Sequence, residues 1–127
     1  MALILVVDDE KDACRLMRQL LTRAGHGVIT FHTGWEAVQW LGDHDPDLVL
    51  LHIKPWHGDA LSVLDHIRRQ RWRTRVIAIT GYPRSESMRV AIQLGIQDCF
   101  VKPMEIQDLE MRINHALGMG SSQESTE

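Results

Sequence analysis

The feature that most constrains the fold is an alternation of two patterns, repeated five times along 127 residues. Short continuous apolar runs predict strands that are buried on both faces of a parallel sheet. Between them, apolar residues recur every three or four positions, which is typical of helices that pack one face on such a sheet. The predicted strands are Leu3–Val7, Val28–Phe31, Leu48–Ile53, Val76–Thr80 and Cys99–Val101. Because parallel strands need helical crossovers, this order predicts an α/β fold, a doubly wound three-layer sandwich around a five-stranded parallel sheet.

Capping signals and apolar spacing define the predicted helices. Gly25 is expected to end the first helix in the left-handed conformation, and Thr33 with Glu36 forms the pattern of a capping box at the start of the second. The residues predicted to face the sheet are Ala13, Leu16, Met17, Leu20, Leu21 and Ala24 in the first helix, Leu61, Leu64 and Ile67 in the third, Met88, Ala91 and Ile92 in the fourth, and Ile106, Leu109, Ile113, Ala116 and Leu117 in the fifth. We expect residues 1–117 to form one domain and residues 118–127 to be a disordered tail, because the tail has little to bury.

Composition excludes several classes of protein. With 14 Lys and Arg against 17 Asp and Glu, the formal charge is -3, which argues against a nucleic-acid-binding domain. The five arginines between residues 68 and 75 are therefore interpreted as a solvated helix end. Two cysteines cannot form a disulfide framework, which favours a reducing compartment. The first apolar run stops at Asp8, so it is too short to span a membrane or to act as a secretory signal. We expect a cytoplasmic protein.

Polar side chains stand where the predicted strands end. They are Asp8, Asp9, His52, Thr80 and Lys102. Functional groups of doubly wound sheets gather at the carboxyl ends of the strands. Two adjacent carboxylates there are hard oxygen ligands for Mg²⁺, and a hydroxyl and an ammonium would hold phosphoryl oxygens. A nucleophile between them is missing.

The chain resembles the receiver domains of bacterial two-component response regulators, of the chemotaxis-regulator type, over about residues 3–117. The motifs that carry the resemblance are Val6-Val7-Asp8-Asp9-Glu10, Pro46-Asp47-Leu48-Val49-Leu50-Leu51, Thr80-Gly81-Tyr82, and Leu94-Gly95 through Lys102-Pro103. The resemblance implies a flavodoxin-like fold and a signalling module rather than an enzyme. Its partner would be a sensor histidine kinase or another signalling protein, and a homodimer would form through the fourth helix, the fifth strand and the fifth helix.

The same resemblance implies roles for individual residues. Asp8 and Asp9 would hold the metal, with His52 and the backbone of Lys54 as further candidate ligands. Thr80 would bond the phosphoryl group, and Lys102 would pair with it.

Two departures from the family pattern decide the interpretation. The family places its phosphate-accepting aspartate at the end of the third strand, where this chain has His52, and an aromatic residue three positions before Lys102, where it has Cys99. An imidazole cannot form an acyl phosphate, and one carboxylate fewer weakens the Mg²⁺ site. Our leading hypothesis is an atypical receiver that is not phosphorylated on aspartate and acts through protein contacts. In it, His52 and Lys102 neutralise Asp8 and Asp9 and hold the domain in one conformation.

Alternatives stay open at this point. One is a receiver that accepts phosphate by an atypical route, at His52 or Asp59. Another is a transition-metal site in which Asp8, Asp9 and His52 are joined by His57. Trp56 would either cover this pocket or anchor its loop.

The acidic turn after the first strand argues against a haloacid-dehalogenase-like phosphatase, which needs Asp-x-Asp, and against a nucleotide or flavin binder, which needs a Gly- or hydroxyl-rich turn.

Overall fold

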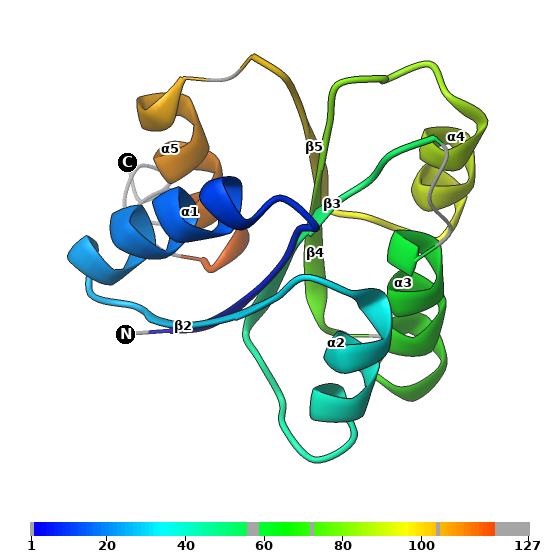
Figure 1. Cartoon of the computed structure of the whole chain (residues 1–127), viewed down its shortest axis with the longest axis horizontal. Coiled ribbons are helices and arrows are strands. Elements are labelled where there is room, and N and C mark those ends of the chain that lie inside the picture. Colours follow the sequence, from blue (N-terminus) through cyan, green and yellow to red (C-terminus); the bar gives the residue numbers. More distant parts are fainter. Residues whose placement is uncertain (1, 56–58, 72, 104, 119–127) are drawn as a thin grey trace, which may run out of the picture.

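The chain folds around one parallel sheet of five strands in the order β2-β1-β3-β4-β5 (Figure 1). This computed structural model describes residues 2–55, 59–71, 73–103 and 105–118. The strands are β1 (Leu3–Val7), β2 (Gly27–Phe31), β3 (Leu48–His52), β4 (Arg75–Thr80) and β5 (Asp98–Val101). The helices are α1 (Lys11–Arg23), α2 (Gly34–Leu41), α3 (Asp59–Gln70), α4 (Glu86–Gln93) and α5 (Ile106–Ala116). The predicted fold class is confirmed.

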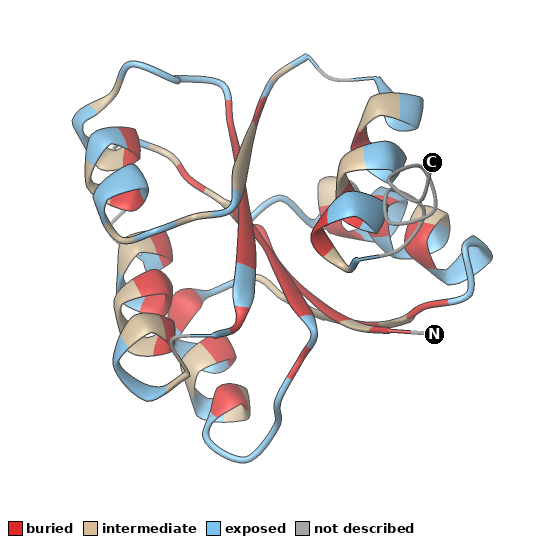
Figure 2. Cartoon of the chain, turned by 180° about the vertical axis from the view of Figure 1, so that it is seen from behind, coloured by how far each residue is buried: buried red, intermediate tan, exposed pale blue. Residues whose placement is uncertain are grey.

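The helices cover the sheet on both faces, α1 and α5 on one and α2, α3 and α4 on the other (Figure 1). Successive residues of a strand point to opposite faces. In β1, Ile4 and Val6 accordingly join the core beneath α1 and α5, whereas Leu5 and Val7 join the core on the other face. Figure 2 shows the result, with buried residues along the strands and on the inward sides of the helices.

The predicted boundaries agree closely with the structure. β3 ends at His52, one residue before the predicted end, and the other strands differ by no more than one residue. Gly25 has a φ of 96° after α1 and Gly95 a φ of 85° after α4, the left-handed conformation expected of glycine at a helix end. The capping box is also present: the Thr33 hydroxyl accepts a hydrogen bond from the Glu36 amide at 3.2 Å and donates to its carboxylate at 3.1 Å.

Three large side chains predicted to face the sheet are exposed instead. Leu16 is 54% exposed, Ile92 60% and Ile106 48%. In α1 the buried residues are Cys14, Met17 and Leu21, a stripe with spacings of three and four. Leu16 lies one residue, or about 100°, away from that stripe, as Ile92 does from buried Ala91. The predictions for these residues were wrong because each helix meets the sheet along a narrower stripe than its apolar residues span.

Ala24 is exposed as well, since it is the C-cap of α1 and not part of its buried face. Among the described residues, no helix has the length and apolarity needed to cross a bilayer. The predicted tail, apart from Gly118, lies outside the described residues.

Candidate functional site

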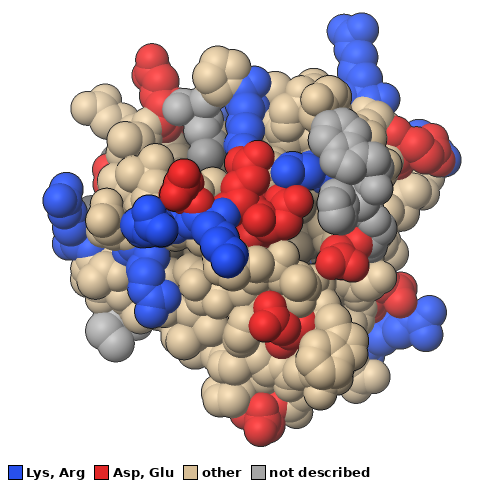
Figure 3. Space-filling model, viewed as in Figure 1, with Lys and Arg blue, Asp and Glu red and all other residues tan. Residues whose placement is uncertain are grey.

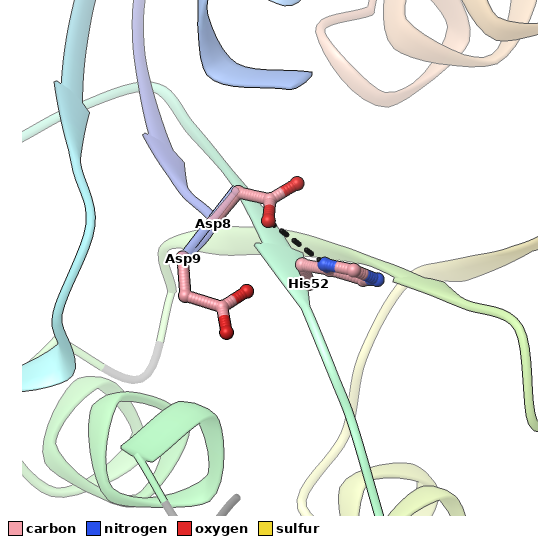
Figure 4. Close-up of side chains that lie close together, drawn as sticks. All are labelled: Asp8, Asp9 and His52. Atoms are coloured by element: carbon pink, nitrogen blue, oxygen red, sulfur yellow. Dashed lines mark hydrogen bonds and ion pairs between the residues drawn. The ribbon is translucent and has the colours of Figure 1, made fainter. Parts of the chain in front are cut away.

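The point where the strand order reverses lies between β1 and β3, and the sequence places three polar residues there. Val7 pairs with Leu51 in the sheet, so Asp8 and His52 each follow a paired residue and lie side by side. His52 Nδ1 is 2.9 Å from Asp8 Oδ1 (Figure 4). The two side chains are only 6% and 10% exposed. The structure therefore brings the imidazole and the first carboxylate into a direct, largely buried contact.

The backbone around Asp8 fixes the direction of its carboxylate. Its amide donates to Phe31 O at 3.1 Å, which continues the sheet one residue past β1. Its Oδ1 also accepts a hydrogen bond from the Glu10 amide at 3.0 Å. Beneath it, the Cys14 thiol donates to Asp8 O at 3.3 Å, and His32 Nδ1 lies 3.2 Å from the same oxygen. Contacts to both the backbone and the carboxylate of Asp8 thus hold this residue toward His52.

Lys54, which was expected to contribute only its backbone to the site, reaches the second carboxylate with its side chain. Lys54 Nζ is 2.9 Å from Asp9 Oδ1 and 3.5 Å from Glu10 Oε2. The hydrogen bond to Asp9 raises the pKa of Lys54 above its usual value, so the ammonium stays charged. The signal for this contact was the spacing of two between His52 and Lys54, which puts side chains on the same side of an extended chain.

Thr80, the last residue of β4, and Lys102, which follows β5, lie away from this contact. The Thr80 side chain is fully buried, and its hydroxyl accepts a hydrogen bond from the Tyr82 amide at 2.9 Å. The Lys102 amide donates to Thr80 O at 2.8 Å, which joins the two residues through the backbone. Within the described residues, however, Lys102 forms no ion pair, and Asp9 is paired with Lys54. The structure thus differs from the hypothesis that Lys102 neutralises the carboxylates.

A small hollow opens beside these groups at the carboxyl edge of the sheet. It has a volume of about 30 Å³, and its lining residues are Val7, Asp8, Asp9, His32, Gly34, His52, Lys54, Asp59 and Ala60. The first residues of α2 and α3 form one wall, where the Gly34 amide donates to Asp59 Oδ2 at 3.2 Å. Such a volume holds about one water molecule. Figure 3 shows acidic and basic side chains gathered together at the centre of this face.

The other predicted candidates lie in different places. Asp59 is at the rim of the hollow, engaged with Gly34. Trp56 and His57 lie outside the described residues. Within the described residues, ligand atoms of Asp8, Asp9 and His52 all lie within 4.8 Å of one another, so these three side chains form a group able to hold a metal ion.

The fold and this acidic edge define a receiver-type signalling module, and comparison with known proteins identifies the family. The response regulator receiver domain family matches residues 4–114, and the chain belongs to it. The regulatory protein AtoC of Escherichia coli is 30% identical over 118 residues, which cover 93% of this chain and 26% of AtoC. The chain spans about a quarter to a half of the curated relatives it matches.

Solved structures of receiver domains have the same architecture. The receiver domain of NtrX from Brucella abortus is 33% identical, with a TM-score of 0.81 over 91% of this chain and 98% of that one. The response regulator TrrA from Thermotoga maritima, solved in complex with Mg(2+)-BeF, is 28% identical, with a TM-score of 0.76 over 91% of this chain and 99% of that one.

Family membership defines the general role of the site. Receiver domains are signalling modules that interact with histidine kinases and other signalling proteins, and they bind Mg²⁺ at an acidic pocket. Mg²⁺ demands oxygen ligands in near-octahedral geometry. Here the third side chain of the pocket offers a nitrogen, one carboxylate is engaged by that imidazole, and the other by an ammonium. This set of donors does not fit Mg²⁺ well.

Proposed function

We propose that this chain is an atypical receiver that signals through protein–protein contacts and is not switched by phosphorylation on aspartate. In this proposal His52, the last residue of β3, stands where family members carry the phosphate-accepting aspartate. The observation that supports it most directly is the 2.9 Å contact between His52 Nδ1 and Asp8 Oδ1. A side chain in that contact occupies the place of the acceptor and engages a carboxylate that would otherwise bind Mg²⁺.

The chemistry of the pocket explains why phosphoryl transfer would be lost. An imidazole cannot form the acyl phosphate that a carboxylate forms. Both carboxylates of the pocket also have partners within it already: His52 contacts Asp8, and Lys54 pairs with Asp9 at 2.9 Å. A metal or a phosphoryl group would have to displace these contacts to enter. The proposed consequence is one conformation that persists without metal or phosphate.

The contact surface of the proposed module has exposed apolar side chains on α4, β5 and α5. They are Ile92, Val101, Ile106 and Met111, each at least 46% exposed. Through this face the chain would bind a sensor histidine kinase, another signalling protein or a second copy of itself. Cys99 in β5 lacks the aromatic ring that family members place three residues before the lysine, which agrees with a module that is not switched there.

Intact mass after incubation with acetyl phosphate and Mg²⁺ tests this proposal. The native protein is compared with two variants. His52→Asp restores a carboxylate at the end of β3, and His52→Asn removes the imidazole without adding a carboxylate. We expect a phosphoryl mass gain in His52→Asp alone. A gain in the native protein would contradict the proposal, and peptide mapping would then test His52 and Asp59 as acceptors. No gain in any variant would show that His52 is not what silences the pocket.

A further inference from the structure

We infer that Asp8, Asp9 and His52 form a binding site for a divalent transition metal of the Zn²⁺ class, in competition with the Lys54 ammonium. This inference rests on the proposed function, in which His52 replaces an aspartate, and it names a ligand for the same pocket. The metal would supply the charge that Lys54 now supplies at Asp9.

The distances between the three side chains suit a single ion. Two ligand atoms of a tetrahedral zinc site, each ~2.1 Å from the metal, stand ~3.4 Å apart. His52 Nδ1 and Asp8 Oδ1 are 2.9 Å apart, and one ligand atom of Asp9 lies within 4.8 Å of both side chains. Side-chain adjustments of about an ångström would therefore bring the three ligand atoms to the separations that one ion requires.

The orientation of the imidazole selects Nδ1 as its ligand atom. In Figure 4, Nδ1 faces Asp8, whereas Nε2 points away from both carboxylates. A proton on Nδ1 has to leave when the metal binds. It moves to Nε2 in the neutral ring, or to solvent from the imidazolium, so no other reactant is needed.

The donor set selects the class of metal. An imidazole is a ligand for Zn²⁺, Cu²⁺, Ni²⁺ and Fe, whereas Mg²⁺ is held by oxygens. One imidazole and two carboxylates give three protein ligands, the number found in zinc sites that keep an open position for water. The neighbouring hollow of about 30 Å³ has room for that water.

Lys54 is the built-in competitor for this site. Its Nζ is 2.9 Å from Asp9 Oδ1, so the ammonium must withdraw for a metal to reach that oxygen. Glu10 Oε2 lies 3.5 Å from the same Nζ and would retain the ammonium after it leaves Asp9. Removing the Lys54 charge should therefore tighten metal binding, and removing the imidazole should weaken it.

Calorimetric titration of the chelator-treated full chain with ZnCl₂ alone tests both signs. We expect one Zn²⁺ per chain, and weaker binding of MgCl₂ in a parallel titration. His52→Asn should lower the Zn²⁺ affinity at least about tenfold, whereas Lys54→Met, which keeps the backbone carbonyl, should raise it several-fold. His44→Asn is the matched control, because His44 also pairs with a carboxylate, that of Asp43 at 2.9 Å, but on the exposed surface. It should bind as the native protein does.

Several results would overturn the inference. They are native affinity in His52→Asn, weaker binding in Lys54→Met, loss of binding in His44→Asn, or Mg²⁺ binding as tight as Zn²⁺. Lys54→Met acts in the opposite direction to His52→Asn, so misfolding of one variant cannot produce the expected pair of results. The proposed function is judged separately: absence of Zn²⁺ binding would leave the acetyl phosphate result unchanged, and phosphorylation of the native protein would leave the Zn²⁺ titration unchanged.

Discussion

Charged side chains gather at both ends of the sheet, but their partners differ in kind. At the carboxyl end of the strands, side chains meet side chains: His52 contacts Asp8, and Lys54 pairs with Asp9. At the amino end, two arginines of the 68–75 stretch, Arg68 and Arg71, meet the backbone. Arg68 donates to Leu94 O at 2.8 Å, Gly95 O at 2.9 Å and Thr74 O at 3.0 Å.

The comparison distinguishes charged side chains that stabilise the fold from charged side chains that an external ion could replace. The last carbonyls of a helix have no partner within the helix and carry partial negative charge. Arg68 satisfies those of α4, and Arg71 donates to Leu41 O at the end of α2. The interpretation of this stretch as a merely solvated helix end was wrong for these two residues, which serve neighbouring helices. At the carboxyl end, by contrast, the partners are side chains, and we propose that a metal cation can replace one of them, the Lys54 ammonium at Asp9.

Loss of Arg68 should produce the largest effect on stability. Arg68→Leu removes a charged donor from three backbone carbonyls, and the half-buried position of Arg68, which lowers its pKa, leaves water little access to replace that donor. We expect the free energy of unfolding to fall by about 2–4 kcal/mol, measured by urea denaturation.

The control for that substitution is the next residue. Arg69 pairs with Asp65 at 3.0 Å through a largely exposed side chain. Arg69→Ala should change the free energy of unfolding by less than about 0.5 kcal/mol. Equal losses in the two variants would show that the arginines at this end are not distinguished by their backbone contacts.

At the carboxyl end, the tightest backbone approach is at Gly34. A Cβ at this position would lie 2.6 Å from Asp59 O, so Gly34→Ala must push α2 away from α3 and widen the hollow. We expect a loss of about 1–3 kcal/mol in unfolding free energy. Gly81→Ala is the control, because a Cβ there meets nothing within 4 Å. A neutral Gly34→Ala would mean that the wall of the hollow yields easily.

The thiol beneath the acidic pocket should be almost inert. Burial, followed by the charge of Asp8, raises the pKa of Cys14 to about 11. Its thiolate fraction at pH 8 is then about 0.1%, and its alkylation rate should keep rising with pH beyond 9 instead of levelling off. Peptide mass spectrometry after iodoacetamide treatment should find Cys99, which is only half-buried, labelled first. Labelling of Cys14 as fast as Cys99 in the native state would show that the backbone beneath Asp8 opens readily.

The smallest effect on stability is expected at Lys54, whose charge we regard as replaceable. Its partner Asp9 is 39% exposed, and such ion pairs contribute little to folding. Lys54→Met should change the unfolding free energy by less than about 1 kcal/mol in the same urea experiment. A loss as large as that of Arg68→Leu would remove the distinction between the two ends.

The fold was predictable from the sequence because its signals are local. Each strand is a continuous apolar run, and Gly25, Thr33 and Gly95 mark helix ends through their own backbone and side-chain chemistry. The exposure of Leu16 and Ile92 was not predictable, since it depends on how each helix is rotated against the sheet. That rotation is set by packing between distant segments and leaves no mark on the spacing of one helix.

The candidate site was predictable in its members more than in its contacts. Strand order alone brings Asp8 and His52 together, because β1 and β3 are neighbours and both residues follow paired positions. Which lysine reaches Asp9 depends on side-chain reach and on the path of the segment after β3. The family resemblance favoured Lys102 as the cation of the pocket, whereas the structure pairs Asp9 with Lys54.

The central claim is that His52 and Lys54 occupy the carboxylates of the pocket. The most direct test is an amide NMR spectrum of the native protein with Mg²⁺ and beryllium fluoride, the combination present in the TrrA structure. The signals to follow are those of Gly81 and Tyr82, next to the buried Thr80 hydroxyl. The account predicts no shift in the native protein and a clear shift in His52→Asp. Equal shifts in both proteins would contradict it, because the pocket would then admit Mg²⁺ together with a phosphoryl mimic despite His52.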